Sequence, residues 1–412
     1  MSRVASAVSQ QTSLTTLMRR QQELVKTQEH VTSGKRILRA SDDPAGAARA
    51  ERALASQTRS EGLLRSLEAS RHAMSQVEST VGDAVDLLQT ARETVVQAGN
   101  GALGDSDRAL LADRLQQVRG QLLTLANADD GTGQFVFGGL GRDRVPFGDT
   151  GSGVDYLGTA GQSEGLLSES LPLAVDGQAL WLQSRTGNGV FETRRDVGTG
   201  STAWIDAGQV RDPAALALQD GQRYELTFDD ASRYSVHLVA DDGSRTPFPD
   251  ASSHTHPFAS GAPIDALPGM RVRISGAAQP GDRFTVAPSS PELSVFDALD
   301  RVIGALTPTP AQPSDAGDLA ELVHHGLRDL DQVLGNFHAV RSRAGETLNR
   351  LDGVDARTQD RILADQDVRS KAEDLDMAQG ISEFTTRQSA YQAALQSYSM
   401  ARKVSLFDYI SS

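Results

Sequence analysis

The two ends of the chain carry the same kind of helical stripe, and this feature restricts the fold more than any other. In residues 14–31 and 381–398, apolar and glutamine side chains recur at intervals of three and four. This spacing is typical of a coiled-coil seam, a single narrow line along each helix. Because a helix with one such line is marginal alone, we expect the ends to pair and fold the chain back on itself. The stripe residues are Leu14, Leu17, Gln21, Leu24, Gln28, Val31, Ile381, Phe384, Gln388, Tyr391, Leu395 and Tyr398.

Composition excludes several classes of protein. The chain has 412 residues, no cysteine and a formal net charge of −14. Without cysteine there is no disulfide, thiolate nucleophile or cysteine-based zinc site. The acidic balance argues against nucleic acid as a main partner, because phosphate binding needs a basic face. No stretch approaches the ~20 apolar residues of a membrane span, and the first residues lack the apolar core of a secretory signal peptide.

Long helices are expected on both sides of a middle region of another kind. A looser stretch near residues 351–354 is expected to precede the C-terminal helix, and a proline-rich breaker is expected at 308–313. The order of helices and middle region along the chain is not that of a tandem repeat. The periodicity predicts helices over about residues 2–32, 44–98, 105–128, 293–303 and 323–351, and through the C-terminal stripe.

A basic loop precedes the second predicted helix. Residues 34–40 contain Arg36, and the sequence Ser-Asp-Asp-Pro follows at 41–44. Asp42 or Asp43 can cap the helix N-terminus, while Pro44 takes the first helical position, where its missing N–H costs nothing. A contact between subunits would explain the aspartate pair equally well.

The middle region, residues 134–290, is rich in glycine, proline, serine and threonine. It contains twelve arginines and no lysine. Short alternating runs separated by turn signals indicate a compact antiparallel β domain inserted between helical halves. The predicted class is therefore α+β and multidomain. The predicted strands include residues 134–137, 223–228, 233–239, 270–274 and 282–286.

No group of residues supports catalysis. His254 and His256 have metal-ligand spacing but no partner cluster, so we interpret them as loop residues. The adjacent His324 and His325 are interpreted as ordinary helix surface. The chain has no serine elbow, zinc helix or cysteine–histidine pair. We predict that it is not an enzyme and holds no cofactor or metal.

Two further motifs have plain interpretations. The pairs Asp229-Asp230 and Asp241-Asp242 are typical of hairpin turns, and no calcium loop surrounds them. The glycines at 138–141 follow a predicted strand, but no helix follows them, so a phosphate cradle is rejected.

The terminal stripes are sparse for a stable two-helix coil. Such a coil buries too little to offset the ordering of ~60 residues at about 1–2 kcal/mol each. Our hypothesis is that the ends are mobile in one molecule and become ordered when many copies pack together.

The loop before the second predicted helix resembles that of a known family. Gly34-Lys-Arg-Ile followed by Ser41-Asp-Asp-Pro-Ala-Gly-Ala-Ala is similar to the loop behind the first rod helix of bacterial flagellins. The resemblance covers about residues 1–140 and 290–412. It implies a fold-back of N- and C-terminal coiled-coil helices (1–33 with 354–412), a helical bundle (34–133 with 291–353) and a solvent-exposed β domain (134–290).

The C-terminal segment and a short motif after the third predicted helix restrict the resemblance to one group within the family. Ser389–Tyr398 and Ser405-Leu-Phe-Asp-Tyr-Ile410 resemble the family members at the hook–filament junction, as does Phe137-Gly138-Gly139. This likeness implies an extracellular structural adaptor exported through the flagellar type III channel, with an export chaperone. It also implies a ring of copies between a second hook-associated protein on the cell side and flagellin on the distal side. Rival interpretations are a filament-forming flagellin and, from another class, a surface adhesin acting through the β domain.

We expect assembly by coupled folding of the terminal helices within and between subunits. The loop at 34–44 would act as a spoke to the outer domain, with Arg36, Asp42, Asp43 and Pro44 as its candidate residues. The expected assembly interface comprises Leu14, Leu17, Leu24, Val31, Ile381, Phe384, Tyr391, Leu395, Tyr398 and Leu406.

Overall fold

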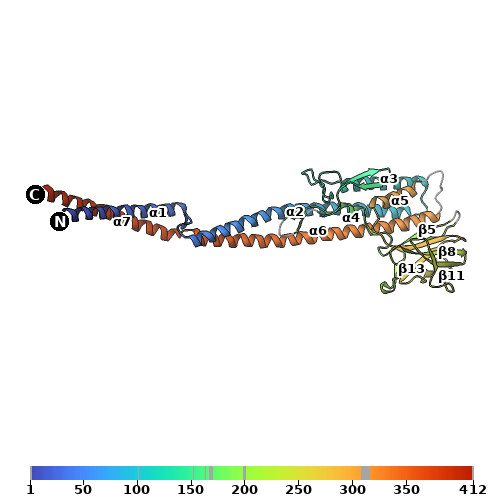
Figure 1. Ribbon diagram of the computed structural model, residues 1–412. Helices are drawn as coiled ribbons and strands as arrows, with labels where there is room; N and C mark the ends of the chain where they lie inside the picture. The colour runs from blue at the N-terminus through green and yellow to red at the C-terminus, as the bar shows by residue number, and fades with distance from the viewer. Residues whose placement is uncertain are drawn as a thin grey trace. The chain divides into compact units, whose positions relative to one another are not determined.

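A computed structural model describes residues 2–100, 102–151, 153–162, 164–166, 170–197, 201–307 and 316–410. The chain divides into two compact units, Met1–Arg65 with Gly353–Ser412 and Ser66–Asp352. The predicted α+β class is confirmed: long helices from both ends of the sequence are combined with inserted antiparallel sheets (Figure 1). None of the helices in the described part of the chain has the length and apolar content needed to cross a membrane.

The predicted helices are present with small shifts of their ends. One expectation was wrong: residues 351–354 do not interrupt a helix, because Leu351 and Val354 are buried inside α6. The break comes later, at 374–376, where the Asp376 carboxylate accepts hydrogen bonds from the first backbone N–H groups of α7. The predicted breaker at 308–313 lies outside the described residues. The long helices are α1 (Ser2–Ser33), α2 (Pro44–Ala98), α3 (Asp105–Ala126), α5 (Val295–Leu306), α6 (Ala316–Glu373) and α7 (Met377–Ile410).

The second unit has a helical core organised around one tryptophan. Trp181, at the end of the short helix α4 (Gly177–Trp181), is fully buried among four phenylalanines. Its ring lies 4.9 Å from that of Phe337 on α6 and 6.0 Å from that of Phe296 on α5. Phe137 and Phe147 complete the cluster at 5.6 and 6.2 Å. Burial of these large rings supplies much of the stability of this core.

Residues 134–137 do not form the predicted strand. They make turns and isolated bridges, and Val136 and Phe137 are buried in the helical core. An alternating apolar run can serve either structure, and here the bulky Phe137 packs edge-on against Trp181.

The predicted strands at 223–228, 233–239, 270–274 and 282–286 are confirmed as parts of β8, β9, β13 and β14. All pairings in the described sheets are antiparallel. The larger sheet has the order β10-β9-β8-β14-β5 with β11 also on β9, and a smaller sheet has β12-β13-β6 with β7 also on β13. Their inner faces bury a second apolar core that includes Phe191, Tyr224 and Phe284.

The strands have the following bounds: β1 (Phe147–Thr150), β2 (Gly153–Tyr156), β3 (Glu164–Leu166), β4 (Ser170–Pro172), β5 (Phe191–Asp196), β6 (Trp204–Ile205), β7 (Gln209–Val210), β8 (Gln222–Asp230), β9 (Arg233–Ala240), β10 (Arg245–Pro247), β11 (Thr255–Pro257), β12 (Pro263–Ile264), β13 (Met270–Ser275) and β14 (Arg283–Pro288).

The interpretation as helix surface was wrong for His325, whereas His324 is exposed as predicted. His324 on α6 stacks on Trp204 of β6, with ring centroids 4.7 Å apart. His325 is largely buried, and this burial lowers the pKa of its imidazole to about 3. The two histidines therefore join the β sheets to α6.

The pair Asp241-Asp242 lies in a turn, as predicted, whereas Asp229 and Asp230 are the last two residues of β8, directly before the turn. Asp230 and Asp242 accept backbone hydrogen bonds from Ser232 and Ser244, two residues further along. In the loop at 138–141, Gly139 has a φ of +64°, and a Cβ there would lie 2.1 Å from the carbonyl oxygen of Thr159. The backbone of Thr159 therefore occupies the space beside this loop.

Candidate assembly site

The terminal helices α1 and α7 pack against each other in the first unit (Figure 1). They run antiparallel: Val31 lies near Gly380, and the Arg387 guanidinium donates to the carbonyl oxygen of Glu23 at 3.2 Å. Of the predicted stripe, those members that are partly buried are Leu17, Leu24, Val31, Phe384, Tyr391 and Tyr398.

The glutamines predicted in the seam are outside it. Gln21, Gln28 and Gln388 are exposed, and the seam positions beside them are taken by Arg20, Thr27 and Arg387. Thr27 is 5% exposed, and its hydroxyl donates to the carbonyl oxygen of Glu23 in its own helix. A small side chain that is satisfied locally tolerates burial, whereas a glutamine amide would need several partners.

A second apolar line is left uncovered on each terminal helix. We define the outer lines as Leu14, Met18 and Val25 on α1 and Met377, Ile381 and Leu395 on α7. The spacing of four, seven and fourteen residues keeps each set on one helix face. Their side chains are between 40% and 54% exposed. Three predicted interface residues, Leu14, Ile381 and Leu395, thus belong to a face that the subunit does not cover.

The loop at 34–43 is bound to the end of α6. The backbone N–H of Arg36 donates to the Glu373 carbonyl oxygen at 2.7 Å, and the N–H of Leu375 donates to the Gly34 carbonyl oxygen at 2.9 Å. The Arg36 guanidinium also donates to the carbonyl oxygen of Ala372 at 2.6 Å. Ile37 is buried beneath this corner. The α1–α2 and α6–α7 connections therefore form one hydrogen-bonded corner.

The aspartate pair has two separate tasks within this corner. Asp43 caps α2: its carboxylate accepts the Gly46 N–H at 2.9 Å, and this hydrogen bond is the largest cause of its lowered pKa. Asp42 binds the Lys26 ammonium at 3.0 Å, which is the largest cause of its own lowered pKa. Pro44 is the first residue of α2, as predicted. Both aspartates thus have structural partners within the subunit.

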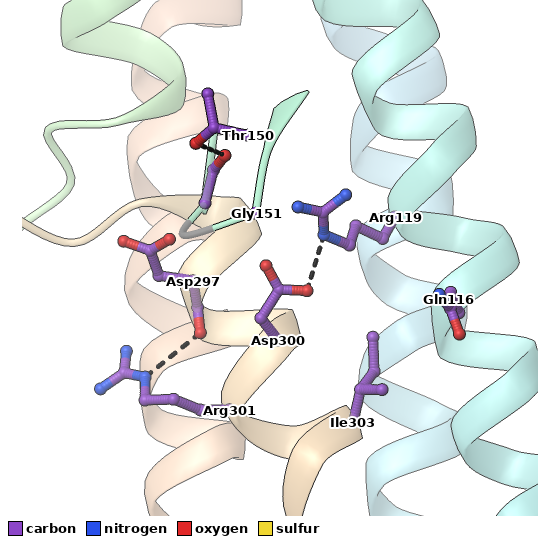
Figure 2. A pocket seen from close by; sticks show the side chains of 9 residues that line it. Gln116, Arg119, Thr150, Gly151, Asp297, Asp300, Arg301 and Ile303 are labelled. Atoms are coloured by element: carbon purple, nitrogen blue, oxygen red, sulfur yellow. Dashed lines mark hydrogen bonds and ion pairs between the residues drawn. The ribbon is translucent and has the colours of Figure 1, made fainter. Parts of the chain in front are cut away.

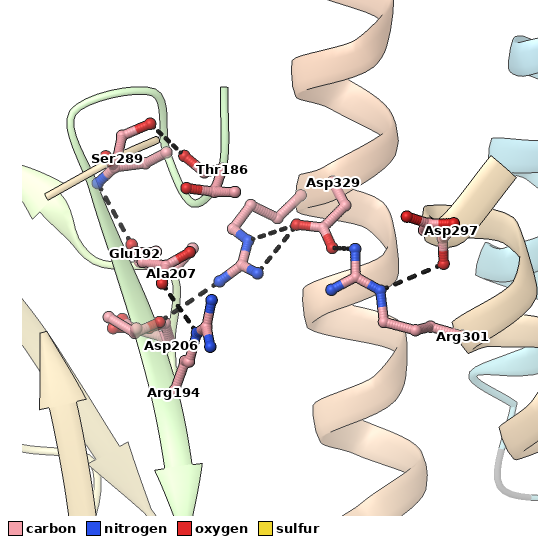
Figure 3. A network of polar contacts seen from close by, with 12 residues as sticks. Thr186, Glu192, Arg194, Asp206, Ala207, Ser289, Asp297, Arg301 and Asp329 are labelled. Atoms are coloured by element: carbon pink, nitrogen blue, oxygen red, sulfur yellow. Dashed lines mark hydrogen bonds and ion pairs between the residues drawn. The ribbon is translucent and has the colours of Figure 1, made fainter. Parts of the chain in front are cut away.

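Two of the polar cavities in the second unit contain ion pairs between neighbouring elements. In the first, of about 620 Å³, Arg119 of α3 binds Asp300 of α5 at 2.6 Å (Figure 2). The same guanidinium binds Asp149 of β1 at 2.7 Å. In the second, of about 550 Å³, the buried Asp329 carboxylate lies between Arg301 and Arg328, each at 2.9 Å (Figure 3). These contacts tie α3 to α5 and β1, and α5 to α6.

The histidines His254 and His256 are not gathered into a ligand set. His254 Nδ1 lies 3.0 Å from the Ala251 carbonyl oxygen, and His256 stacks against Tyr234. Within the described residues, no three histidine or carboxylate side chains are placed to hold a metal ion. Leu406 lies in α7, but its side chain is outside the described part of the chain.

Three comparisons relate the chain to known proteins. The model of the bacterial flagellin N-terminal helical region matches residues 4–141. Flagellar hook-associated protein 3 of Escherichia coli (strain K12) is 26% identical over 388 residues, 94% of this chain and 93% of that protein. A crystal structure of flagellar hook associated protein-3 from Legionella pneumophila has a TM-score of 0.69 at 25% identity and covers 78% and 98% of the two chains. Another, described as the flagellar junction protein FlgL from Legionella pneumophila, has a TM-score of 0.61 at 25% identity, with 71% and 95% covered.

Proposed function

The chain belongs to the bacterial flagellin family, and from this premise we propose that it is a structural, non-enzymatic protein of the extracellular hook–filament junction. The observation that carries the proposal is similarity along nearly the whole chain to hook-associated protein 3, including the β region between the helical halves. Similarity to a filament flagellin covers less of the chain.

Assembly through the outer lines is the mechanism that the exposed faces support. Within one subunit, α1 and α7 use Leu17, Leu24, Phe384 and their neighbours for each other. The outer lines can be buried only by another molecule, and burying apolar surface contributes about 25 cal/mol per Å². A contact in which different faces of two copies meet is heterologous and repeats around a ring.

The remaining partners follow from the position of a junction. We assign copies of this chain as ring neighbours, a second hook-associated protein on the cell side and flagellin on the distal side. An export chaperone would hold the chain before secretion. In this scheme residues 1–33 and 354–412 form the rod, 34–133 and 291–353 the helical bundle, and 134–290 the solvent-exposed β region. Arg36, Asp42, Asp43 and Pro44 form the spoke.

Deletion of the gene tests the function directly. We expect electron micrographs of the deletion strain to show hooks without filaments, with flagellin shed into the medium. Normal filaments in that strain would refute the proposal. Seeded polymerisation distinguishes a junction protein from a filament-forming flagellin. A flagellin grows long filaments from a seed, whereas a junction protein adds a short collar and stops.

The outer lines are tested with Met18→Glu combined with Val25→Glu. Each change places a charge where a neighbour's apolar surface should lie, so incorporation should be lost. Gln22→Glu, at an exposed polar position of the same helix, is the control and should incorporate normally. Normal incorporation of the double variant would contradict the role of the outer lines.

A further inference from the structure

Beyond the terminal helices, the paired segments of α2 and α6 in the first unit form a stem, which we define as residues 44–65 and 353–373. A buried seam joins the two helices and includes Ala50, Ala53, Val354, Thr358 and Ala372. The Arg369 guanidinium donates to the Gln57 side chain across this seam at 3.2 Å. The seam positions fix which helix faces point to either side of the stem.

Charge is sorted between the two sides of the stem. On an antiparallel helix pair, side chains that directly precede the seam positions of either helix lie on one flank, and those that directly follow them lie on the other. The first flank carries six basic residues and no acidic one, and we call it the basic flank. Its members are Arg49, Arg52, Arg59, Arg357, Arg361 and Lys371.

The opposite flank has the reverse charge. It carries four acidic residues, with Arg65 as the single basic exception, and we call it the acidic flank. Its members are Glu51, Glu61, Asp355 and Glu373. Asp360 and Asp367 lie on the outer face of α6, where the Asp367 carboxylate binds the Lys371 ammonium of the basic flank at 2.7 Å.

Most of the basic flank has no ionic partner within the subunit. Among the described residues, the five arginines of this flank make no ion pair, and Arg49 and Arg52 donate only to carbonyl oxygens of their own helix, at 3.3 and 3.0 Å. All five are exposed. Like charges three to ten residues apart on a helix repel one another, so this arrangement lowers the stability of a lone subunit. An acidic surface from outside would offset that repulsion.

We infer that the stem binds a second copy of this chain, with the basic flank of one subunit against the acidic flank of the next. Neither flank can face itself, because like charges would then be brought together. The contact is therefore heterologous and continues from copy to copy in one direction. This inference rests on the proposed function, because it names the side-by-side contact of the junction ring. The stem is also continuous with α1 and α7, whose outer lines face a neighbour in the proposed ring.

Charge reversal tests the inference in the full-length protein, expressed in a bacterium whose own copy is deleted. The basic-flank variant is Arg52→Glu, Arg59→Glu and Arg361→Glu, and the acidic-flank variant is Glu51→Lys, Glu61→Lys and Asp355→Lys. Each should reduce the number of filaments per hook by ~10-fold or more, since opposed like charges cost over about 1.4 kcal/mol in total. The variant with all six changes restores opposite charges and should return filaments to the wild-type level.

Three controls make the result decisive. Arg144→Glu, Arg233→Glu and Arg273→Glu change the net charge by the same amount as the basic-flank variant, at exposed positions that are not part of the stem, and should leave filament number unchanged. Circular dichroism and the amount of secreted protein show that each variant folds and is exported. The variant with all six changes, co-expressed with the wild type, should form mixed rings poorly. Where a variant copy meets a wild-type copy, the two facing flanks carry charge of the same sign.

The outcomes separate this inference from the proposed function. If both single-flank variants form filaments normally, the flanks do not meet and the inference is wrong. The inference is also wrong if the variant with all six changes is folded and secreted but forms no filaments. If the wild-type gene itself fails to restore filaments, the junction function is wrong.

Discussion

Trp204 of β6 stacks on His324 of α6, with ring planes 12° apart. This contact and the neighbouring His325 connect the β sheets to the helical core of the same unit. We expect Trp204→Ala to destabilise the unit by about 1–3 kcal/mol, because an aromatic pair contributes beyond its buried area. Trp204→Phe keeps a stacking surface and should cost less. Urea denaturation followed by the fluorescence of Trp181 measures both, and equal losses would show that stacking contributes nothing.

Burial of His325 makes the second unit sensitive to acid. Its pKa is lowered from the usual 6.5 to about 3, first by burial and then by the nearby Arg328 guanidinium. Between these two pH values the unfolded chain binds a proton at this position and the folded chain does not, so stability falls as the pH is lowered through this window. His325→Gln should lose less stability than the wild type between pH 6.5 and 3.5. The exposed His338→Gln should follow the wild type, and an unchanged pH profile for His325→Gln would rule out this role.

Trp181 should be the most sensitive position of the helical core. It is fully buried, so Trp181→Ala should cost about 3–5 kcal/mol through the cavity that it leaves. Its indole Nε1 has no hydrogen-bond partner in the described structure, so Trp181→Phe loses volume but no hydrogen bond and should cost clearly less. Chemical denaturation followed by circular dichroism tests this order. The exposed Leu157→Ala serves as control and should stay within about 0.5 kcal/mol of the wild type.

Asp43 should hold the first turn of α2. Asp43→Ala removes the acceptor for the Gly46 N–H, so amides at residues 46 and 47 should exchange faster with solvent. Asn can accept the same bond, and Asp43→Asn should keep protection near the wild-type level. Because the carboxylate pKa is lowered in the folded state, the wild-type cap should weaken as the pH falls below about 4. Unchanged exchange in the alanine variant would mean that other contacts hold this turn.

The terminal helices should be the least protected helices of the free protein. Apart from Thr27, their seam residues are only partly buried, and the outer lines are open. We expect amides in 10–31 and 381–398 to exchange much faster than those in 112–126, which line the helical core. Hydrogen exchange of the purified monomer measures the difference. Strong protection of both ends would sink the hypothesis that they become ordered on assembly.

The sequence was sufficient for the helices, because their apolar periodicity is long and their ends carry recognisable caps. Asp43 and Pro44 were placed correctly for that reason. The alternating runs of β8 and β9 were equally legible. A three–four spacing, however, does not distinguish two adjacent lines on one helix. Thr27 enters the seam in place of Gln28 through a hydrogen bond to its own helix, a preference that apolar counting does not detect.

Contacts between distant segments were beyond the sequence patterns. Nothing near Trp181 indicates that Phe137, Phe296 and Phe337 surround it, because those residues come from separate elements. His324 and His325 likewise look like ordinary helix residues until Trp204 and the β sheets are placed beside them. Only a histidine pair on an otherwise apolar stretch of helix could have prompted the question.

The corner between Gly34 and Leu375 has a mechanical consequence. A helix pair attached through one flexible linker could swivel about that linker. Here two connections leave the α1–α7 pair together, and backbone hydrogen bonds from Arg36 to Glu373 and from Leu375 to Gly34 prevent one from sliding past the other. A joint of this kind resists twisting. Torque applied to the α1–α7 pair therefore passes to the α2–α6 pair through both connecting segments. A protein placed between a rotating hook and a long filament requires that property.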